Sequence, residues 1–213
     1  VEVAVKDRQL AERLLSGDWA QEAKRRLQLR GPVSRKPFNS NGQRVLEISL
    51  PFLGRWASWQ LSEKSAKDCG DGGMTWAMAV VLAKLLGRVP EYPRLRVLEL
   101  GSGSGFVALV LAGRGHEIVA TDGSDCVRQN LLSNTASHPR IKIRRLRWHV
   151  AEDWRIATGS FDLVVGANLM QDAAHCDALR GLLRALPGEF LFLERNRLGQ
   201  ATRCVDLCQR DGF

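Results

Sequence analysis

A strand, a glycine-rich turn and a helix follow one another directly in this chain and restrict its fold more than any other feature. An apolar strand leads into Gly101–Gly105, which reads G-S-G-S-G, and an apolar helix is predicted over Phe106–Ala112. A second apolar strand ends at Asp122. Glycines let a backbone approach a ligand closely, and a carboxylate after the next strand can hold the two hydroxyls of a ribose. The segment therefore predicts half of a nucleotide-binding site.

The spacing of the glycines restricts the ligand. A dinucleotide-binding loop reads G-x-G-x-x-G, but the position of its third glycine is Phe106 in this chain. Glu99, two residues before the first glycine, would repel a pyrophosphate yet could accept a hydrogen bond from an ammonium group. The predicted ligand has a ribose and a positive charge but no phosphate, and S-adenosylmethionine (SAM) fits that description. Two alternatives stay open: a packing turn without a ligand and, disfavoured by Phe106, a nicotinamide cofactor.

Several further segments accompany the glycine loop in an order found in one known family. They are Trp76 in M-T-W-A-M-A, Ala120–Asp122 (A-T-D), Asn130–Asn134 (N-L-L-S-N), Leu146–Trp148 (L-R-W) and Phe161–Ala167 (F-D-L-V-V-G-A). With them, residues 40–213 resemble a class I, seven-strand SAM-dependent methyltransferase of the small protein-lysine methyltransferase-like group. The resemblance implies SAM as cofactor, S-adenosyl-L-homocysteine as product and a protein lysine side chain as methyl acceptor.

The strand-end pattern and the resemblance together assign the cofactor-binding residues. We expect Asp122 to accept from the ribose hydroxyls and Glu99 to contact the methionine ammonium directly or through water. In similar proteins Trp76 lies beside the methionine part and Trp148 packs near the adenine. The structural alternatives are a loop cap for Glu99, a helix cap for Asp122 and plain core for both tryptophans. The full expected set is Trp76, Glu99, Gly101, Ser102, Gly103, Gly105, Asp122, Gly123, Trp148 and Ala167.

The resemblance breaks down at one functional position. The family usually continues its fourth strand as D-x-x-Y beside the substrate lysine, whereas Asn168–Gln171 reads N-L-M-Q. We take Asn168 and Gln171 as the candidate catalytic residues, expected to line the methyl-transfer opening. Amides can hydrogen-bond a neutral group, but neither can act as a general base. Three functions therefore stay open: a lysine methyltransferase, a methyltransferase of RNA or a small molecule, and a catalytically silent SAM-binding interaction module.

Alternating strands and helices predict an α/β fold, a Rossmann-like, doubly wound and mostly parallel sheet with helices on both faces. Strands are expected at Leu95–Leu100, Glu117–Thr121, Ile141–Trp148, Phe161–Gly166 and Glu189–Leu193, and helices at Thr75–Leu86, Phe106–Ala112, Ser124–Asn134, Ala173–Ala185 and Ala201–Arg210. The candidate residues fall at the carboxyl ends of strands, where such sheets bind ligands. The two strands that normally end a class I methyltransferase have no counterpart, so we expect a truncated sheet or one completed otherwise.

The sequence before the alternating strands and helices has a different pattern and predicts an extension. We expect residues 1–74 to form a helical and β-hairpin extension packed on the SAM-binding core, residues 75–213. Apolar residues have helical spacing over 5–29, and Gly31-Pro32 ends that part. Val45–Leu50 and residues 56–61 alternate as two short strands of a hairpin outside the main sheet. Residues 1–40 could form a partner-binding arm.

The composition limits the kinds of partner that the protein is expected to have. The net charge of +8 suggests an acidic partner, either a protein surface or nucleic acid. The densest basic cluster, residues 140–147, overlaps a predicted strand, so a solvated strand face is the alternative. No apolar stretch is long enough to span a membrane, and the start does not resemble a signal peptide. A monomeric protein is expected.

The cysteines and histidines predict no metal site and a reducing environment. Five scattered cysteines favour reduced thiols in a cytoplasmic protein that could also be nuclear. Cys204 and Cys208 share a helix face, which indicates buried thiols more than metal ligands, because no other paired cluster accompanies them. The four histidines, His116, His138, His149 and His175, have no ligand spacing.

Overall fold

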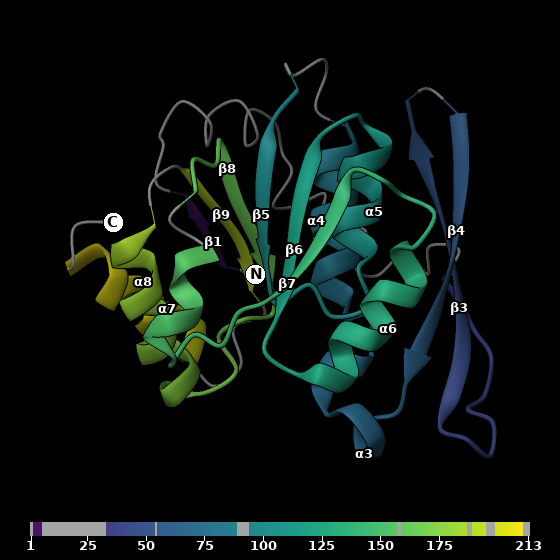
Figure 1. Ribbon diagram of the computed structural model, residues 1–213, viewed down its shortest axis with the longest axis horizontal. Coiled ribbons are helices and arrows are strands. Elements are labelled where there is room, and N and C mark those ends of the chain that lie inside the picture. Colours follow the sequence, from purple (N-terminus) through teal and green to yellow (C-terminus); the bar gives the residue numbers. More distant parts are fainter. Residues whose placement is uncertain are drawn as a thin grey trace.

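A six-stranded sheet forms the centre of the fold (Figure 1). The structure, a computed structural model, describes residues 2–5, 33–53, 55–88, 94–156, 159–186, 189–194 and 199–210. The strand order is β1-β9-β8-β5-β6-β7. The strands are β1 (Glu2–Val5), β5 (Arg96–Leu100), β6 (Glu117–Asp122), β7 (Ile141–Arg145), β8 (Leu163–Ala167) and β9 (Glu189–Glu194). All neighbouring pairs from β9 to β7 are parallel, and β1 runs antiparallel to β9.

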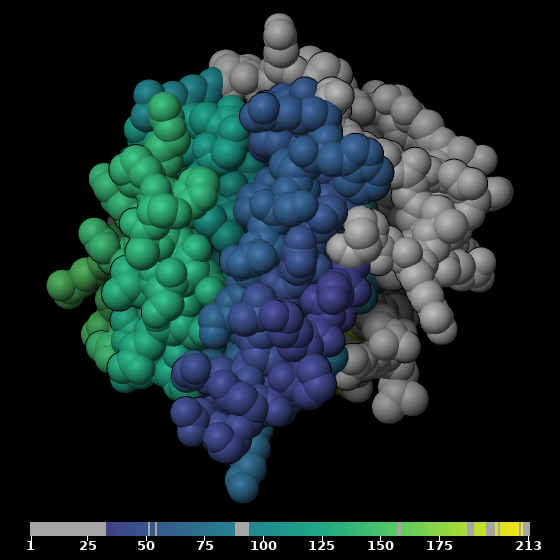
Figure 2. All heavy atoms as spheres, turned by 90° about the vertical axis from the view of Figure 1, so that its right-hand side faces the viewer, coloured from purple at the N-terminus to yellow at the C-terminus, as the bar shows by residue number. Residues whose placement is uncertain are grey.

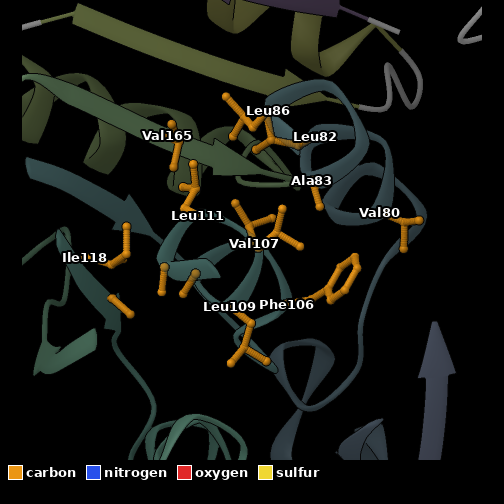
Figure 3. Packing of buried hydrophobic residues seen from close by; sticks show 14 of the residues in the cluster. Val80, Leu82, Ala83, Leu86, Phe106, Val107, Leu109, Leu111, Ile118 and Val165 are labelled. Atoms are coloured by element: carbon orange, nitrogen blue, oxygen red, sulfur yellow. The ribbon is translucent and has the colours of Figure 1, made fainter. Parts of the chain in front are cut away.

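Helices cover both faces of this sheet (Figure 1). Its strands are buried and apolar, and alternate residues face opposite layers: Val97 packs with one core cluster and Leu98 with the other. Figure 3 shows the first cluster, where α4 and α5 pack together against the sheet. One face carries α4 (Ala77–Arg88), α5 (Phe106–Gly113) and α6 (Asp125–Thr135), and the other carries α7 (Ala173–Ala185) and α8 (Gln200–Arg210). The predicted doubly wound α/β fold is confirmed.

The strands that follow β5 in the chain are added first on one side of it and then on the other. Strands β6 and β7 lie on one side of β5, and β8 and β9 lie on the other. In open parallel sheets, ligands bind outside the carboxyl ends of the strands at such a switch point. This topology places the ends of β5 and β8, and therefore Gly101 and Asn168, next to each other.

A second, antiparallel sheet lies outside α4, α5 and α6 (Figures 1 and 2). It consists of β2 (Val33–Arg35), β3 (Gln43–Phe52) and β4 (Arg55–Lys64). Its inner face buries Leu46, Ile48 and Leu50, and Trp59 stands edge-on to Phe106 of α5 at 5.7 Å between ring centroids. The predicted hairpin outside the main sheet is confirmed. The short helices α3 (Ala66–Cys69) and η1 (Asp71–Gly73) then lead back to the core.

Strand β1, from the amino-terminal part of the chain, forms one edge of the main sheet. Glu2 lies opposite Glu194, and Val5 lies opposite Leu191. The sequence left open how the sheet is completed, and within the described residues this short strand occupies the antiparallel edge. The predicted helix over residues 5–29 and the turn at Gly31-Pro32 fall almost entirely on residues 6–32, which lie outside the described part.

Many element boundaries differ from the expectation by one to three residues. Strand β7 ends at Arg145 rather than at Trp148, because Arg147 turns toward the 3-10 helix η2 (Ala151–Ile156) and pairs there with Asp153. Helix α4 begins at Ala77 rather than at Thr75. Ser124 is the N-cap of α6, and its hydroxyl accepts a hydrogen bond from the N–H of Val127.

The expectation of reduced cysteines is wrong for most of them. Cys69 and Cys126 form a disulfide, as do Cys176 and Cys204, with Cα–Cα distances of 5.5 and 5.7 Å. The paired residues are 57 and 28 positions apart, so the folded chain and not their spacing brings them together. Cys208 is buried on α8 and takes part in neither bond. Within the described ranges no His, Cys, Asp or Glu cluster could hold a metal ion, and no helix is long and apolar enough to cross a membrane.

The disulfides predict a simple thiol count. In unfolded protein that has not been reduced, we expect one thiol per chain, that of Cys208, to react with a thiol reagent. After reduction, all five cysteines should react. A count of five before reduction, in protein purified under air and protected from reshuffling at low pH, would contradict both pairs.

Candidate active site

A cavity of about 740 Å³ opens at the carboxyl ends of β5, β6 and β8. Its size lies within the range of pockets that bind small organic ligands. Most of the predicted site residues meet on its wall: Trp76, Gly101, Ser102, Gly103, Asp122, Gly123, Trp148, Ala167, Asn168 and Gln171. Glu99 and Gly105 do not line it. Segments that are far apart in sequence therefore converge as the strand-end argument predicts.

The glycine loop is tied to the neighbouring strand. The N–H of Ser102 donates to the carbonyl of Thr121 at 2.8 Å, and the N–H of Thr121 donates back to the Ser102 hydroxyl at 3.0 Å. The Thr121 hydroxyl donates to the carbonyl of Glu99 at 2.7 Å. These bonds satisfy buried backbone groups and hold the loop rigidly against β6.

Gly105 has a packing role at the start of α5. Its φ is +88°, in the left-handed region. A Cβ atom at this position would lie 2.5 Å from Cδ1 of Leu131, too close for any side chain. Gly105 therefore allows α5 and α6 to approach each other behind the loop, and it does not itself face the cavity.

Asp122 stands where β6 ends and joins the loop to the next helix. One carboxylate oxygen accepts from the N–H of Gly103 at 3.3 Å, and the other accepts from the N–H of Ser124 at 3.0 Å. Burial raises the pKa of Asp122 above its ordinary value, against these hydrogen bonds. A carboxylate can accept about four hydrogen bonds, so room remains for two hydroxyls of a ribose on the cavity side.

Glu99 lies under the loop, away from the cavity. Its carboxyl group is buried, and its Oε2 has no hydrogen-bond partner among the described residues. Burial raises the pKa of Glu99 to about 8, although hydrogen bonds from Ser102 and the backbone of Ala108 oppose this. The position fits a group that supports the loop, and the unpaired oxygen could still accept one donor, such as a water that reaches the ligand.

Trp148 is held on the cavity wall by its neighbours. Arg147 makes a two-bond ion pair with Asp153, at 2.8 and 3.0 Å, and this pair lowers the pKa of Asp153 to about 2. The Trp148 carbonyl accepts from the indole N–H of Trp154 at 3.0 Å. The Trp148 ring stands edge-on to His175 at 6.2 Å. A fixed aromatic face on the wall is suited to pack against a flat heterocycle.

A tight turn after β8 presents the two amides. Asn168 adopts a left-handed conformation with φ +56°. Glu194, at the end of β9, accepts from the N–H groups of Leu169 at 2.7 Å and Met170 at 3.1 Å. Glu194 is buried, and burial raises its pKa to about 7.

The comparison with known sequences decides the family. Residues 57–195 match the family model described as lysine methyltransferase.

This chain belongs to the lysine methyltransferase family. The resemblance read from its motifs is confirmed.

The chain is also similar to individual proteins of known activity. EEF1A lysine methyltransferase 3 of Mus musculus is 30% identical over 96 residues, which cover 44% of this chain and 40% of that protein. Protein-lysine N-methyltransferase EFM3 of Chaetomium thermophilum is 31% identical over 167 residues, covering 67% of this chain and 48% of that protein. The matched parts thus span about half or less of the length of these relatives.

A solved structure shows the same fold at lower identity. The 16S rRNA N2 G1207 methyltransferase RsmC of T. thermophilus, in complex with AdoMet and guanosine, superposes with a TM-score of 0.53. It is 21% identical, and the match covers 74% of this chain and 43% of that one. This likeness supports the Rossmann-like methyltransferase fold.

The structure adds cavity residues to which the sequence assigned no role in the site. His149 and His175 lie on the cavity wall. His175 Nδ1 lies 2.9 Å from a carboxylate oxygen of Asp172, at the start of α7. Metal-ligand spacing was the wrong test for these histidines. His149 directly follows the L-R-W segment and His175 lies four residues after the N-L-M-Q segment, and this closeness to strand-end motifs is the signal that could have found them.

Proposed function

We propose that this chain is the SAM-binding core of a methyltransferase that modifies a lysine side chain of a protein. The observation that carries the proposal is the convergence of the glycine loop, Asp122, Trp148 and the turn at Asn168 on one cavity. Membership of the lysine methyltransferase family and the relatives named as protein-lysine methyltransferases support it. The proposal extends to a monomeric protein. The expected place in the cytoplasm or nucleus rested on reduced cysteines and is not part of the proposal, because two disulfides form.

The residues present fit SAM. Asp122 would hold the ribose, the loop Gly101–Gly103 would contact the ribose and methionine parts, and Trp148 would pack on the adenine. Trp76 would lie beside the methionine part. When bound, SAM supplies a methyl group on a sulfonium, and S-adenosyl-L-homocysteine is left when an amine nitrogen has taken that methyl. The chain itself then has to bind, align and shield the two partners.

Asn168 and Gln171 would orient the acceptor at the opening. Neither side chain titrates, so neither can take the proton that a lysine amine must lose before it can attack. We propose that the amine loses that proton to water and that the two amides align the neutral form. Glu194 accepts hydrogen bonds from the backbone of this turn, and these bonds would keep the amides in place.

Transfer of a labelled methyl group tests the proposal. Full-length protein is incubated with methyl-labelled SAM and a cell extract, with Asp122→Ala as the blank. We expect label that protease removes and ribonuclease does not, and methyl-lysine on amino-acid analysis. Label that only ribonuclease removes would identify an RNA methyltransferase instead.

The replaced D-x-x-Y pattern favours a second candidate, a SAM-binding module without lysine transfer. Restoring the family residues by Asn168→Asp with Gln171→Tyr separates the two. If the natural chain is a lysine enzyme, it transfers methyl groups before the change. Transfer that occurs only in the restored protein, while calorimetry finds SAM bound to both, would establish the silent module.

Exposed basic residues support an acidic protein substrate. Lys142, Arg144 and Arg145 are exposed on β7, and Arg145 lies opposite Asp122, at the cavity end of the sheet. Arg147, two residues further on, lines the cavity. A substrate segment with acidic residues beside its lysine would be attracted to this edge.

Neutralising this edge should weaken substrate binding alone. For Lys142, Arg144 and Arg145 together replaced by glutamine, we expect KM for the protein substrate to rise several-fold and its salt dependence to flatten. The Kd of SAM should not change. Glutamine at the exposed Lys36, Arg55 and Lys67 is the control with the same loss of charge. An equal effect in both triple variants would show that only net charge matters.

A further inference from the structure

A buried carboxylate with two arginine partners lies on the second sheet, next to the cavity wall. Glu63 on β4 is fully buried, at 0% exposure. One of its carboxylate oxygens lies 2.6 Å from Nε of Arg44 on β3 and 3.5 Å from Nε of Arg35 on β2. Each of the three strands thus contributes one residue. Burying a carboxylate is costly unless it is paired and hydrogen-bonded, and Glu63 has both kinds of partner.

The cluster holds one residue of the cavity wall, Thr75, from two sides. The second carboxylate oxygen of Glu63 accepts from the N–H of Thr75 at 2.7 Å. Arg35 donates to the carbonyl of Thr75 at 2.6 Å. The hydroxyl of Thr75 forms a 2.5 Å hydrogen bond with the hydroxyl of Ser104, in the glycine loop. Thr75 is therefore fixed through both its backbone and its side chain, and the partner of its side chain belongs to the glycine loop.

The wall segment beside Thr75 lies directly on the glycine loop. Gly103 has φ +53°, and a Cβ atom there would lie 3.2 Å from the carbonyl oxygen of Gly72 and 3.8 Å from that of Met74. Residues 72–76 therefore cross the loop at backbone contact distance. A small shift of Thr75 would change the width of the cavity between Trp76 and the loop, since both line it.

The same stretch of β4 reaches the loop by a second path. The Asn134 side chain on α6 donates to the carbonyls of Ser62 and Ser104, at 3.0 and 2.9 Å, and accepts from the N–H of Ser62 at 2.8 Å. Asn130 also donates to the carbonyl of Ser62, at 2.9 Å. The N-L-x-x-N segment thus locks the hairpin onto the cofactor side of the core. Figure 2 shows the second sheet and α6 side by side.

We propose that Glu63 is a positioning residue for the part of the cavity that receives the methionine portion of the cofactor. It acts through Thr75 and sets the distance between the Met74–Trp76 wall and the glycine loop. This inference rests on the proposed binding of SAM in this cavity. The second sheet is then part of the binding site rather than an external extension.

Two ligands that differ only in the amino-acid portion test the inference. S-adenosylhomocysteine carries it, and 5′-methylthioadenosine lacks it. We expect Glu63→Gln, which weakens the acceptor for Thr75 and leaves two arginines without their counter-charge, to lower the affinity for S-adenosylhomocysteine about tenfold. The affinity for 5′-methylthioadenosine, held by Asp122 and Trp148, should stay within about twofold.

Three further variants are titrated with both ligands by isothermal calorimetry. Glu117→Gln makes the same chemical change at an exposed ion pair with Arg94 and should bind both ligands as the wild type does. Thr75→Val keeps the charge cluster and removes only the bond to Ser104, so it should show the same selective loss even if Glu63→Gln fails to fold. Thr75→Ser keeps that hydroxyl and should retain wild-type affinity for both ligands.

The outcomes separate the two claims. Equal loss of both ligands in Glu63→Gln and Thr75→Val, or no loss in either variant, would overturn the positioning role while SAM binding stands. A wild-type chain that binds neither ligand would overturn the proposed function, and the positioning role with it.

Discussion

Asp122→Ala is expected to reduce the affinity for SAM at least about 100-fold, because two hydrogen bonds from ribose hydroxyls to a charged acceptor would be lost together. The same change removes the acceptor for the N–H of Gly103 at 3.3 Å and for that of Ser124 at 3.0 Å, so the loop would also lose support. Isothermal titration of SAM into each protein gives the affinities.

Two further variants define what this loss means. Asp122→Asn keeps one acceptor oxygen without the charge and should bind with intermediate affinity. Asp177→Ala removes an exposed aspartate on α7 that pairs with Arg180 at 3.3 Å, and it should bind SAM normally. Wild-type affinity in Asp122→Ala would mean that the ribose site lies elsewhere in the cavity.

The free energy of unfolding is expected to fall as the pH rises from about 4.5 to about 8, because of Glu99. Burial raises the pKa of its carboxyl group from 4.5 to about 8. Over this range the folded chain keeps a proton that the unfolded chain has released, and stability then decreases with pH. The complete loss corresponds to about 5 kcal/mol and is reached above about pH 8. Urea unfolding at a series of pH values measures it.

Glu99→Gln cannot ionise and should remove this part of the pH dependence. Glu194, whose pKa is raised to about 7 by burial, acts in the same direction, so the difference between variant and wild type isolates Glu99. Curves that run parallel between pH 4.5 and 8 would contradict the shifted pKa.

The release of a proton when SAM binds distinguishes the two roles considered for Glu99. If its carboxylate meets the ammonium group of SAM, directly or through water, binding at pH 7 should release a proton from Glu99. If it only supports the loop, it stays protonated and no proton is released. Calorimetric titrations in buffers of different ionisation enthalpy distinguish these results, and Glu99→Gln gives the baseline.

Much of the site could be read from the sequence because it depends on strand ends. Gly101, Asp122, Trp148 and Asn168 each lie at or just after the end of a predicted strand, and parallel strands place their carboxyl ends on one edge. Gly105 and Glu99 have the right spacing but do not line the cavity. Spacing identifies the loop, whereas the packing of Leu131 against Gly105 and the burial of Glu99 decide which atoms face the ligand.

The contacts that support the site from outside the cavity could not be predicted from strand ends. Glu63 and Thr75 are only twelve positions apart, but their bond forms because a charged strand residue turns inward to two arginines from other strands. A buried carboxylate looks in sequence like any exposed one. The bonds of Asn134 to Ser62 and Ser104 likewise join three elements whose distance depends on the packing of the second sheet.

The sequence by itself determined the α/β fold, the hairpin outside the main sheet, the methyltransferase family and most of the cavity wall, because these follow from local periodicity and from glycine and carboxylate positions at strand ends. Only the tertiary structure decided the antiparallel place of β1, the two disulfides, the inward direction of Glu63 and the burial of Glu99 outside the cavity wall. These depend on contacts between residues distant in the chain, and burial and pairing, which set their energies, exist only once the layers have packed.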